Sequence, residues 1–179
     1  ISATEDGKHK TVIDLLCEKY KNYKVFPVGR LDIDTEGLLL LTNDGVLAHN
    51  LLSPKKHVDK KYYVELKEPL TIEKKKILEN GIKLEENFVT KKAKIEIIDK
   101  DKVKDKNKNI DIININKANS VFITISEGKF HQVKRMFKFV ENEVLYLKRV
   151  KMGKLLLPED LKLGEYRELS EEEMNLILN

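Results

Sequence analysis

Residues 29–45 place an arginine and several carboxylates in a short segment that leads into an apolar run. They read Gly-Arg-Leu-Asp-Ile-Asp-Thr-Glu-Gly-Leu-Leu-Leu-Leu-Thr-Asn-Asp-Gly. The four leucines at 38–41, followed by turn residues, predict a short strand buried on both faces. A chain that enters such a strand must hold Arg30, Asp32 and Asp34 at a cleft or edge, because burying polar groups without partners costs free energy. Asp32 is therefore the candidate catalytic nucleophile.

Two segments far apart in the chain carry a resemblance to one enzyme family. Residues 29–45 resemble the signature of the ribosomal RNA pseudouridine synthases, in which the aspartate of Arg-Leu-Asp is catalytic, and Asp32 matches it. Residues 125–137, Ile-Ser-Glu-Gly-Lys-Phe-His-Gln-Val-Lys-Arg-Met-Phe, resemble the family's basic motif in the form of the small-subunit branch, the RsuA family. Lys60-Lys61-Tyr62 resembles the family's Lys-x-Tyr, and residues 164–167 resemble its C-terminal segment, so the resemblance spans nearly the whole chain.

The resemblance implies a reaction that needs a carboxylate but neither a metal nor a redox cofactor. Pseudouridine formation breaks a C–N glycosidic bond, rotates the uracil and rejoins it through carbon. Asp32 would either attack the base or ribose covalently or remove a proton to form a glycal, and the sequence leaves both routes open. Lys134 matches the basic residue that pairs with the aspartate, since an opposite charge within about 4–6 Å keeps a carboxylate ionised. Arg135 is the rival for that role.

The same resemblance assigns residues to RNA. Tyr62 matches the tyrosine that stacks on the target base, which must leave its helix and enter a pocket. Arg30 would fill the vacated space or hold the phosphate. The expected catalytic residues are Asp32, Tyr62 and Lys134, and the expected RNA-binding residues are Arg30, Lys60, His131 and Arg135.

The RsuA-type motif implies 16S ribosomal RNA as the substrate, with uridine 516 as the first choice of target. 23S ribosomal RNA is the runner-up. The expected partner is ribosomal RNA or a small-subunit assembly intermediate, and the protein is expected to be a cytoplasmic monomer without a membrane partner. A non-catalytic RNA-binding module is a further alternative. The carboxylate of Asp32 argues against it, because a pure phosphate binder has no use for an acid where RNA approaches.

A calcium site is a rival interpretation of the same loop. Asp32, Asp34, Glu36 and Gly37 fit the start of an EF-hand loop. Position twelve would be Asn43 instead of a glutamate, however, and the leucines would lie in a loop that should be exposed. The four histidines are scattered, so no metal centre is expected.

The composition limits the classes of protein to which this chain can belong. The 179 residues, 41% of them apolar, are enough for one core or for two small subdomains that share a cleft. The sequence has no apolar run near the roughly 20 residues that cross a bilayer and no signal peptide at its start. Cys17, the single cysteine, permits no internal disulfide and is expected as a small core residue on an early helix.

Charge gives a weaker indication of the partner. The net charge of +4 supports a polyanionic partner without demonstrating one, and basic residues cluster at 55–61, 91–94 and 148–151. Among the 34 basic residues there are four arginines, all in segments that match the family: Arg30, Arg135, Arg149 and Arg167. Arginine suits bidentate phosphate contacts.

Periodicity and capping signals predict the elements. Helices are expected at 11–21, 44–52, 71–80 and 130–140, with a final helix that starts at Ser170 and has Glu173 in a capping box. Strands are expected at 25–28, 62–66, 95–98, 110–115, 121–125 and 144–147, with a solvated insertion at 99–109. The helix at 130–140 places Val133, Met136, Phe137 and Val140 on one apolar face, beneath a basic one.

Together these features predict an α+β, pseudouridine synthase-like fold. The expected architecture is a mixed, mostly antiparallel bent sheet with flanking helices around a central basic cleft, with Asp32 at its floor. Residues 1–179 are expected to form one catalytic domain of two subdomains sharing the sheet. The resemblance implies that relatives usually carry a small S4 RNA-binding domain before this region, and this chain is expected to be the catalytic domain without it.

Overall fold

The computed structural model describes residues 1–53, 56, 58–98 and 119–178. The strand expected at 110–115 and the insertion expected at 99–109 lie outside these residues. No helix within the described ranges is long and apolar enough to cross a membrane.

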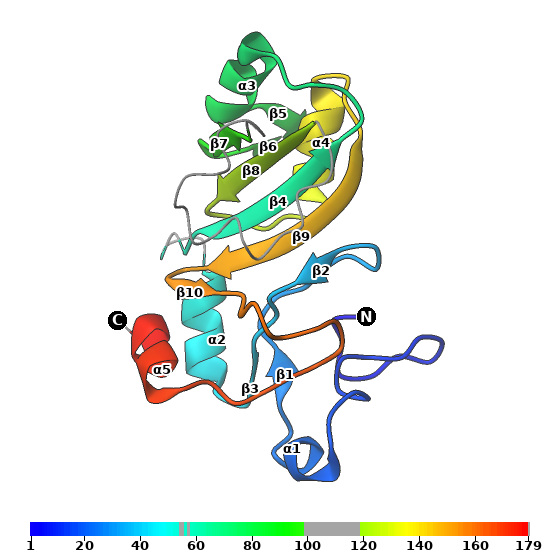
Figure 1. Ribbon diagram of the computed structural model, residues 1–179, viewed down its shortest axis with the longest axis vertical. Coiled ribbons are helices and arrows are strands. Elements are labelled where there is room, and N and C mark those ends of the chain that lie inside the picture. Colours follow the sequence, from blue (N-terminus) through cyan, green and yellow to red (C-terminus); the bar gives the residue numbers. More distant parts are fainter. Residues whose placement is uncertain (54–55, 57, 99–118, 179) are drawn as a thin grey trace.

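A bent, mostly antiparallel sheet forms the centre of the molecule (Figure 1). Its strands run in the order β10-β9-β4-β8-β7, with β4 at Lys60–Leu66, β7 at Lys94–Ile97, β8 at Ser120–Ile125, β9 at Val144–Met152 and β10 at Leu155–Leu156. The short β2 (Glu36–Gly37) joins β9 in parallel. The register between β4 and β9 shifts at Lys61/Tyr62 and at Glu65/Leu66, and such irregularities bend a strand. The expected α+β fold with a mixed sheet is confirmed.

Two helices cover one face of this sheet. They are α3 (Ile72–Glu79) and α4 (Gln132–Phe139), and both lie at the upper end of Figure 1. Val133, Met136, Phe137 and Val140 are all buried against the strands, as the helical spacing predicted. The apolar stripe of α4 therefore fixes which of its side chains turn outward.

A second cluster of buried side chains joins the end of the sheet at β9 and β10 to the elements that lie below it in Figure 1. The elements around it are β1 (Phe26–Pro27), β3 (Leu41–Thr42), α2 (Gly45–Leu52) and α5 (Glu171–Leu178). The remaining elements are α1 (Glu18–Asn22) and the hairpin of β5 (Lys83–Glu85) and β6 (Phe88–Val89). Asp44 caps α2 by accepting hydrogen bonds from the amides of Val46 and Leu47, and Ser170 and Glu173 form the predicted capping box.

The helix expected at 11–21 is wrong in its first half, because helix begins only at Glu18. Thr11 and Asp14 exchange hydrogen bonds in a single turn, and the chain then becomes extended at Cys17. The amide of Cys17 donates to the hydroxyl of Tyr166, 2.8 Å away, instead of continuing a helix. Cys17 itself is exposed, so its expected place in the core is also wrong.

The strand expected at 38–41 is also wrong in its extent. Leu38 and Leu40 are buried, whereas Leu39 and Leu41 are only partly so. The amide of Leu38 donates to the carbonyl of Arg149 in β9, and the carbonyl of Leu40 accepts from Val28 beside β1. The leucines thus cross from the central sheet to the small β1–β3 pair instead of forming one strand.

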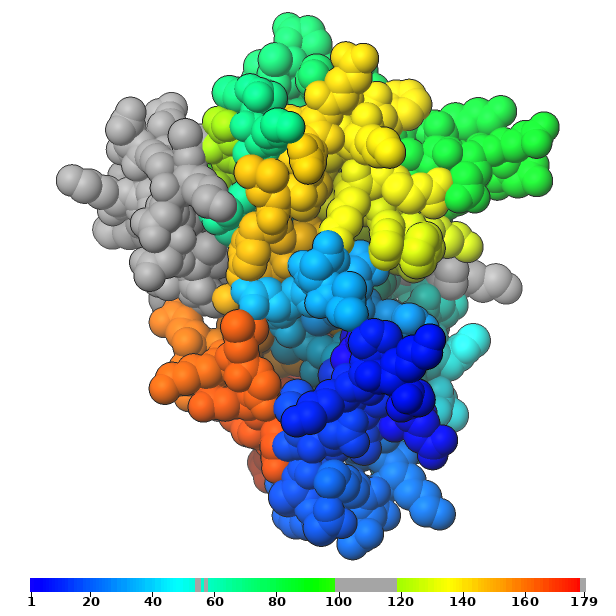
Figure 2. Space-filling model, turned by 90° about the vertical axis from the view of Figure 1, so that its right-hand side faces the viewer, coloured from blue at the N-terminus to red at the C-terminus, as the bar shows by residue number. Residues whose placement is uncertain are grey.

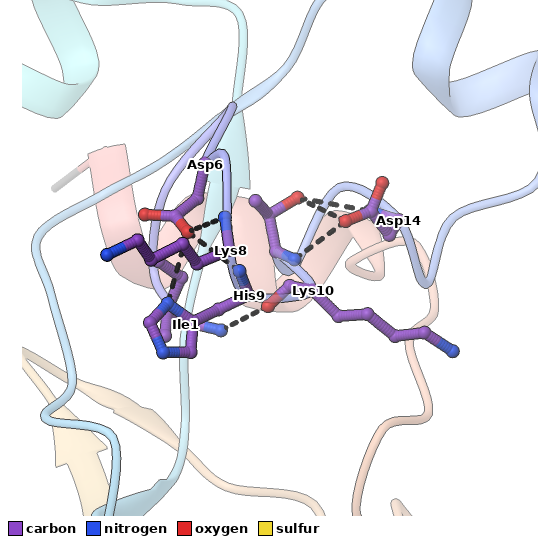
Figure 3. A network of polar contacts seen from close by, with 7 residues as sticks. Ile1, Asp6, Lys8, His9, Lys10 and Asp14 are labelled. Atoms are coloured by element: carbon purple, nitrogen blue, oxygen red, sulfur yellow. Dashed lines mark hydrogen bonds and ion pairs between the residues drawn. The ribbon is translucent and has the colours of Figure 1, made fainter.

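Polar contacts hold the N-terminal loop against the segment that precedes Asp32. Figure 3 shows the amino group of Ile1 donating to the carbonyl of Lys10, and the carboxylate of Asp6 accepting from the amides of Lys8 and His9. In the same loop, the hydroxyl of Ser2 accepts a hydrogen bond from the amide of Leu31 at 2.9 Å. The N-terminal residues therefore brace the chain one residue before Asp32.

Replacing Gly37 with alanine is expected to destabilise the fold. Gly37 has a φ of 113°, and an added Cβ would lie 2.3 Å from the carbonyl oxygen of Arg149. Unfavourable backbone strain of this kind costs about 1–3 kcal/mol, and the overlap adds to it. The measurement is the free energy of unfolding in urea. Gly45→Ala is the matched control, since its Cβ meets nothing within 4 Å and should be neutral or slightly stabilising. Equal stability of the two variants would contradict the close approach of β2 to β9.

Candidate active site

Asp32 lies in a turn immediately before β2, facing the start of α4. The amide of Thr35 donates to the carbonyl of Asp32 at 2.9 Å and closes the turn. His131 Nε2 lies 3.5 Å from Asp32 Oδ1, and Lys134 Nζ lies 3.8 Å from Oδ2. The carboxylate keeps 25% of its side-chain surface exposed, so it is sheltered but open to a substrate. Residues a hundred positions apart thus form one charged cluster.

Lys134 lies between two carboxylates. Besides approaching Asp32, its ammonium donates to Oδ1 of Asp34, which is 68% exposed. This hydrogen bond lowers the pKa of Asp34 below its ordinary value. The sequence showed Asp34 only as one of several acids in the loop, because nothing local indicates that it shares the lysine with Asp32.

The structure does not bring Arg135 to Asp32. Its Nη2 lies 2.6 Å from Oε1 of Glu85 and donates to the carbonyl of Leu84 at 3.3 Å, both in the β5–β6 hairpin. Successive residues of a helix point in different directions, so only one of the pair Lys134 and Arg135 faces Asp32. The geometry therefore favours Lys134 as the partner of the carboxylate.

A small pocket of about 60 Å³ opens beside Asp32. Tyr62, Arg30, Thr35 and His131 are among its lining residues. Tyr62 is only 8% exposed and belongs to the core cluster under α4, so its ring forms a fixed wall.

Lys60 lies apart from this group, buried at 5% exposure. Its ammonium donates to the carbonyl of Val58 at 2.9 Å. Burial, together with the nearby Arg149 guanidinium, lowers the pKa of Lys60. Arg149 is 2% exposed and donates from Nε to the carbonyl of Leu38 at 2.7 Å. Sequence reasoning noted Arg149 as a rare arginine but missed that it holds the chain behind Asp32.

A larger groove of about 730 Å³ runs from Asp32 along the N-terminal and C-terminal segments. Its walls are mainly apolar and include Val12, Leu15, Leu31 and Leu161, with Lys148 and Lys162 among its charged residues. In Figure 2 the light-blue segment that follows residue 30 lies between the yellow segment around α4 and the dark-blue N-terminal residues. Asp32 is therefore a lining residue of both the small pocket and this groove.

The Asp32 carboxylate thus lies near a lysine and a histidine, beside a buried tyrosine of the mixed sheet. The chain belongs to the RNA pseudouridylate synthase family, whose model matches residues 2–139. It is an RNA pseudouridine synthase, and hence an isomerase.

Individual relatives are similar over almost all of the chain. An uncharacterised RNA pseudouridine synthase of Bacillus subtilis is 50% identical over 177 residues, which cover 99% of this chain and 68% of the relative. The ribosomal small subunit pseudouridine synthase A of Escherichia coli is 39% identical, covering 97% and 68%. That of Yersinia pestis is also 39% identical, covering 97% and 66%. A crystal structure of a pseudouridylate synthase superposes with a TM-score of 0.81 at 35% identity, covering 98% of this chain and 68% of the other.

Replacing Lys134 with glutamine is expected to raise the pKa of Asp34 back toward its ordinary value of 3.8. Because the lysine lowers this pKa in the folded protein, the stability that the pair contributes is present above the ordinary pKa and is lost as the pH falls through the lowered one. NMR titration of the Asp34 carboxyl carbon measures the change. Lys134→Arg keeps the charge and should keep the pKa low. An unchanged titration of Asp34 in the glutamine variant would contradict the pairing.

Proposed function

We propose that this enzyme converts one uridine of 16S ribosomal RNA to pseudouridine, with uridine 516 as its target. The observation that carries the chemistry is the Asp32 carboxylate, held between His131 and Lys134 at the mouth of a pocket walled by Tyr62. The small-subunit target is supported by the 39% identity to synthases named for the ribosomal small subunit. 23S ribosomal RNA is the second candidate, because relatives in that branch share the Arg-Leu-Asp segment.

The reaction is an exchange of bonds within one nucleotide. The bond from C1′ of the ribose to N1 of uracil breaks, the ring rotates, and C5 bonds to C1′. The proton on C5 is then lost and N1 gains one, so the product is an isomer of the substrate. Asp32 acts either by forming a covalent bond to the nucleotide or by removing a proton on the way to a glycal.

The surrounding residues act on the charge and the position of the reacting groups. Lys134 places a positive charge beside Asp32, which offsets the cost of holding a carboxylate in the pocket when a base excludes water. Tyr62, fixed by the core around it, stacks on the flipped uracil. Arg30, which is exposed and lines the pocket, can move aside as the base enters.

RNA binding is proposed for the basic residues around the mouth. Arg30 is exposed and lines the pocket, so it can hold a phosphate or fill the space that the base leaves. His131 lies beside Asp32 and lines the same pocket. Arg135 is paired with the β5–β6 hairpin, and Lys60 is buried away from the mouth, so we propose that these two act on RNA only through the positive potential that they add.

The proposed setting follows from the substrate. A catalytic domain spanning residues 1–179 would act as a monomer. Its partner would be ribosomal RNA or a small-subunit assembly intermediate, and it would act in the compartment where ribosomes are assembled. Relatives extend beyond the region that this chain matches, so binding of the RNA outside the target loop is expected to involve their additional residues.

Replacing Asp32 with asparagine is expected to lower the rate of pseudouridine formation by about 10²–10⁴-fold or more, because the amide neither attacks nor accepts a proton. RNA affinity should change little. The measurement is release of tritium from RNA labelled at C5 of uridine, with single-turnover kinetics. Asp34→Asn is the matched control, two residues away in the same loop, and should keep most of the activity. Equal activity of wild type and Asp32→Asn would exclude Asp32 as the catalytic carboxylate.

Mapping pseudouridines in cells tests the target. In a strain without the gene, the modification at uridine 516 of 16S ribosomal RNA should disappear, and expression of the wild-type chain, but not of Asp32→Asn, should restore it. Sites in 23S ribosomal RNA serve as the internal comparison. Loss of a 23S site with an intact 16S site would favour the second candidate.

A further inference from the structure

The loop that leads into α4 presents an aromatic side chain to solvent. Phe130 is 76% exposed, and its ring lies parallel to that of His131, with centroids 3.8 Å apart and an angle of 17° between the planes. Phe130 belongs to none of the core clusters that the described residues form. A single exposed apolar residue is common on protein surfaces, so the meaning of Phe130 depends on what lies around it.

Buried hydrogen bonds hold this loop in one conformation. Gln132, 3% exposed, donates from Nε2 to Oε1 of Glu127 at 2.7 Å and accepts from the amide of Lys129 at 3.0 Å. Glu127, 8% exposed, also accepts from the amide of Lys91 at 2.8 Å. His131 has a φ of 48°, a left-handed conformation that non-glycine residues seldom adopt. A rigid loop thus presents the ring at little entropic cost to binding.

One member of the stacked pair, His131, contacts the proposed catalytic carboxylate. The His131 ring that backs Phe130 is 3.5 Å from the Asp32 carboxylate through Nε2. Lys129 precedes Phe130 in the same loop, and Lys134 follows in the first turns of α4. A flat apolar ring among cations matches a nucleic acid, which presents flat bases along a chain of phosphates.

We propose that the Phe130 ring, backed by His131, is a stacking platform for the nucleobase next to the target uridine. This inference rests on the proposed function. When the uridine turns into the pocket, the adjacent base loses one stacking neighbour, and an aromatic ring beside Asp32 replaces it. Because every base has a flat face, the platform contributes affinity and positioning for any neighbouring base, and it leaves the choice of target to other contacts.

Fluorescence of 2-aminopurine, placed next to the target uridine in a 16S fragment that contains uridine 516, tests the platform. The binding measurements use proteins that carry Asp32→Asn, so that the RNA stays unreacted. With Phe130 present, the fluorophore should be quenched by stacking. With Phe130→Leu it should brighten, and the affinity for the fragment should fall about 5- to 150-fold. Phe130→Tyr should restore both values.

Phe139→Leu is the matched control, because Phe139 is also an exposed phenylalanine, 51% exposed, at the far end of α4. It should change neither fluorescence nor affinity, and thermal unfolding should be alike for both leucine variants. Unchanged quenching and affinity in Phe130→Leu, with an active wild-type enzyme, would overturn the platform alone. If the wild-type enzyme modifies no ribosomal RNA, the proposed function is overturned as well. A loss of affinity equal in Phe139→Leu would also contradict the platform.

Discussion

The backbone pairing of Leu38 with Arg149 is the contact on which the site depends. The Leu38 amide donates to the Arg149 carbonyl at 2.7 Å, and Arg149 Nε returns a hydrogen bond to the Leu38 carbonyl at 2.7 Å. Only glycine fits at position 37, because β2 approaches β9 so closely. A buried pairing of this kind is costly to break, so the loop before it has one position on the sheet. Asp32 takes its place opposite α4 as a result.

Charge balance around Asp32 is the second constraint. Asp32 and Asp34 share one lysine, and His131 approaches the other carboxylate oxygen of Asp32. Two carboxylates that close would repel one another without the cation. Lys134 is 23% exposed, so its charge is screened less than that of a free surface lysine. One helix position therefore offsets the negative charge of both carboxylates in the loop.

The sequence predicted correctly those helices whose signals lie within the helix itself. The spacing of Val133, Met136 and Phe137 indicated α4, and the pair Ser170 and Glu173 indicated the start of α5. The prediction failed where a distant partner competed for backbone groups. Tyr166 takes the amide of Cys17 and ends the expected first helix, and β1 and β9 divide the leucines at 38–41 between them. Propensity is a weak prior against such tertiary contacts.

The sequence by itself determined the proposed chemistry, since the types and motifs of Asp32, Tyr62 and Lys134 single these residues out as candidates. Only the tertiary structure decided which cation faces the acid, because Lys134 and Arg135 are neighbours in sequence and diverge around the helix. It also decided that Lys60 is buried, that Asp34 shares the lysine, and that Phe130 is held outward. Distances between residues a hundred positions apart depend on packing and hydrogen bonds across the whole chain, which no local pattern contains.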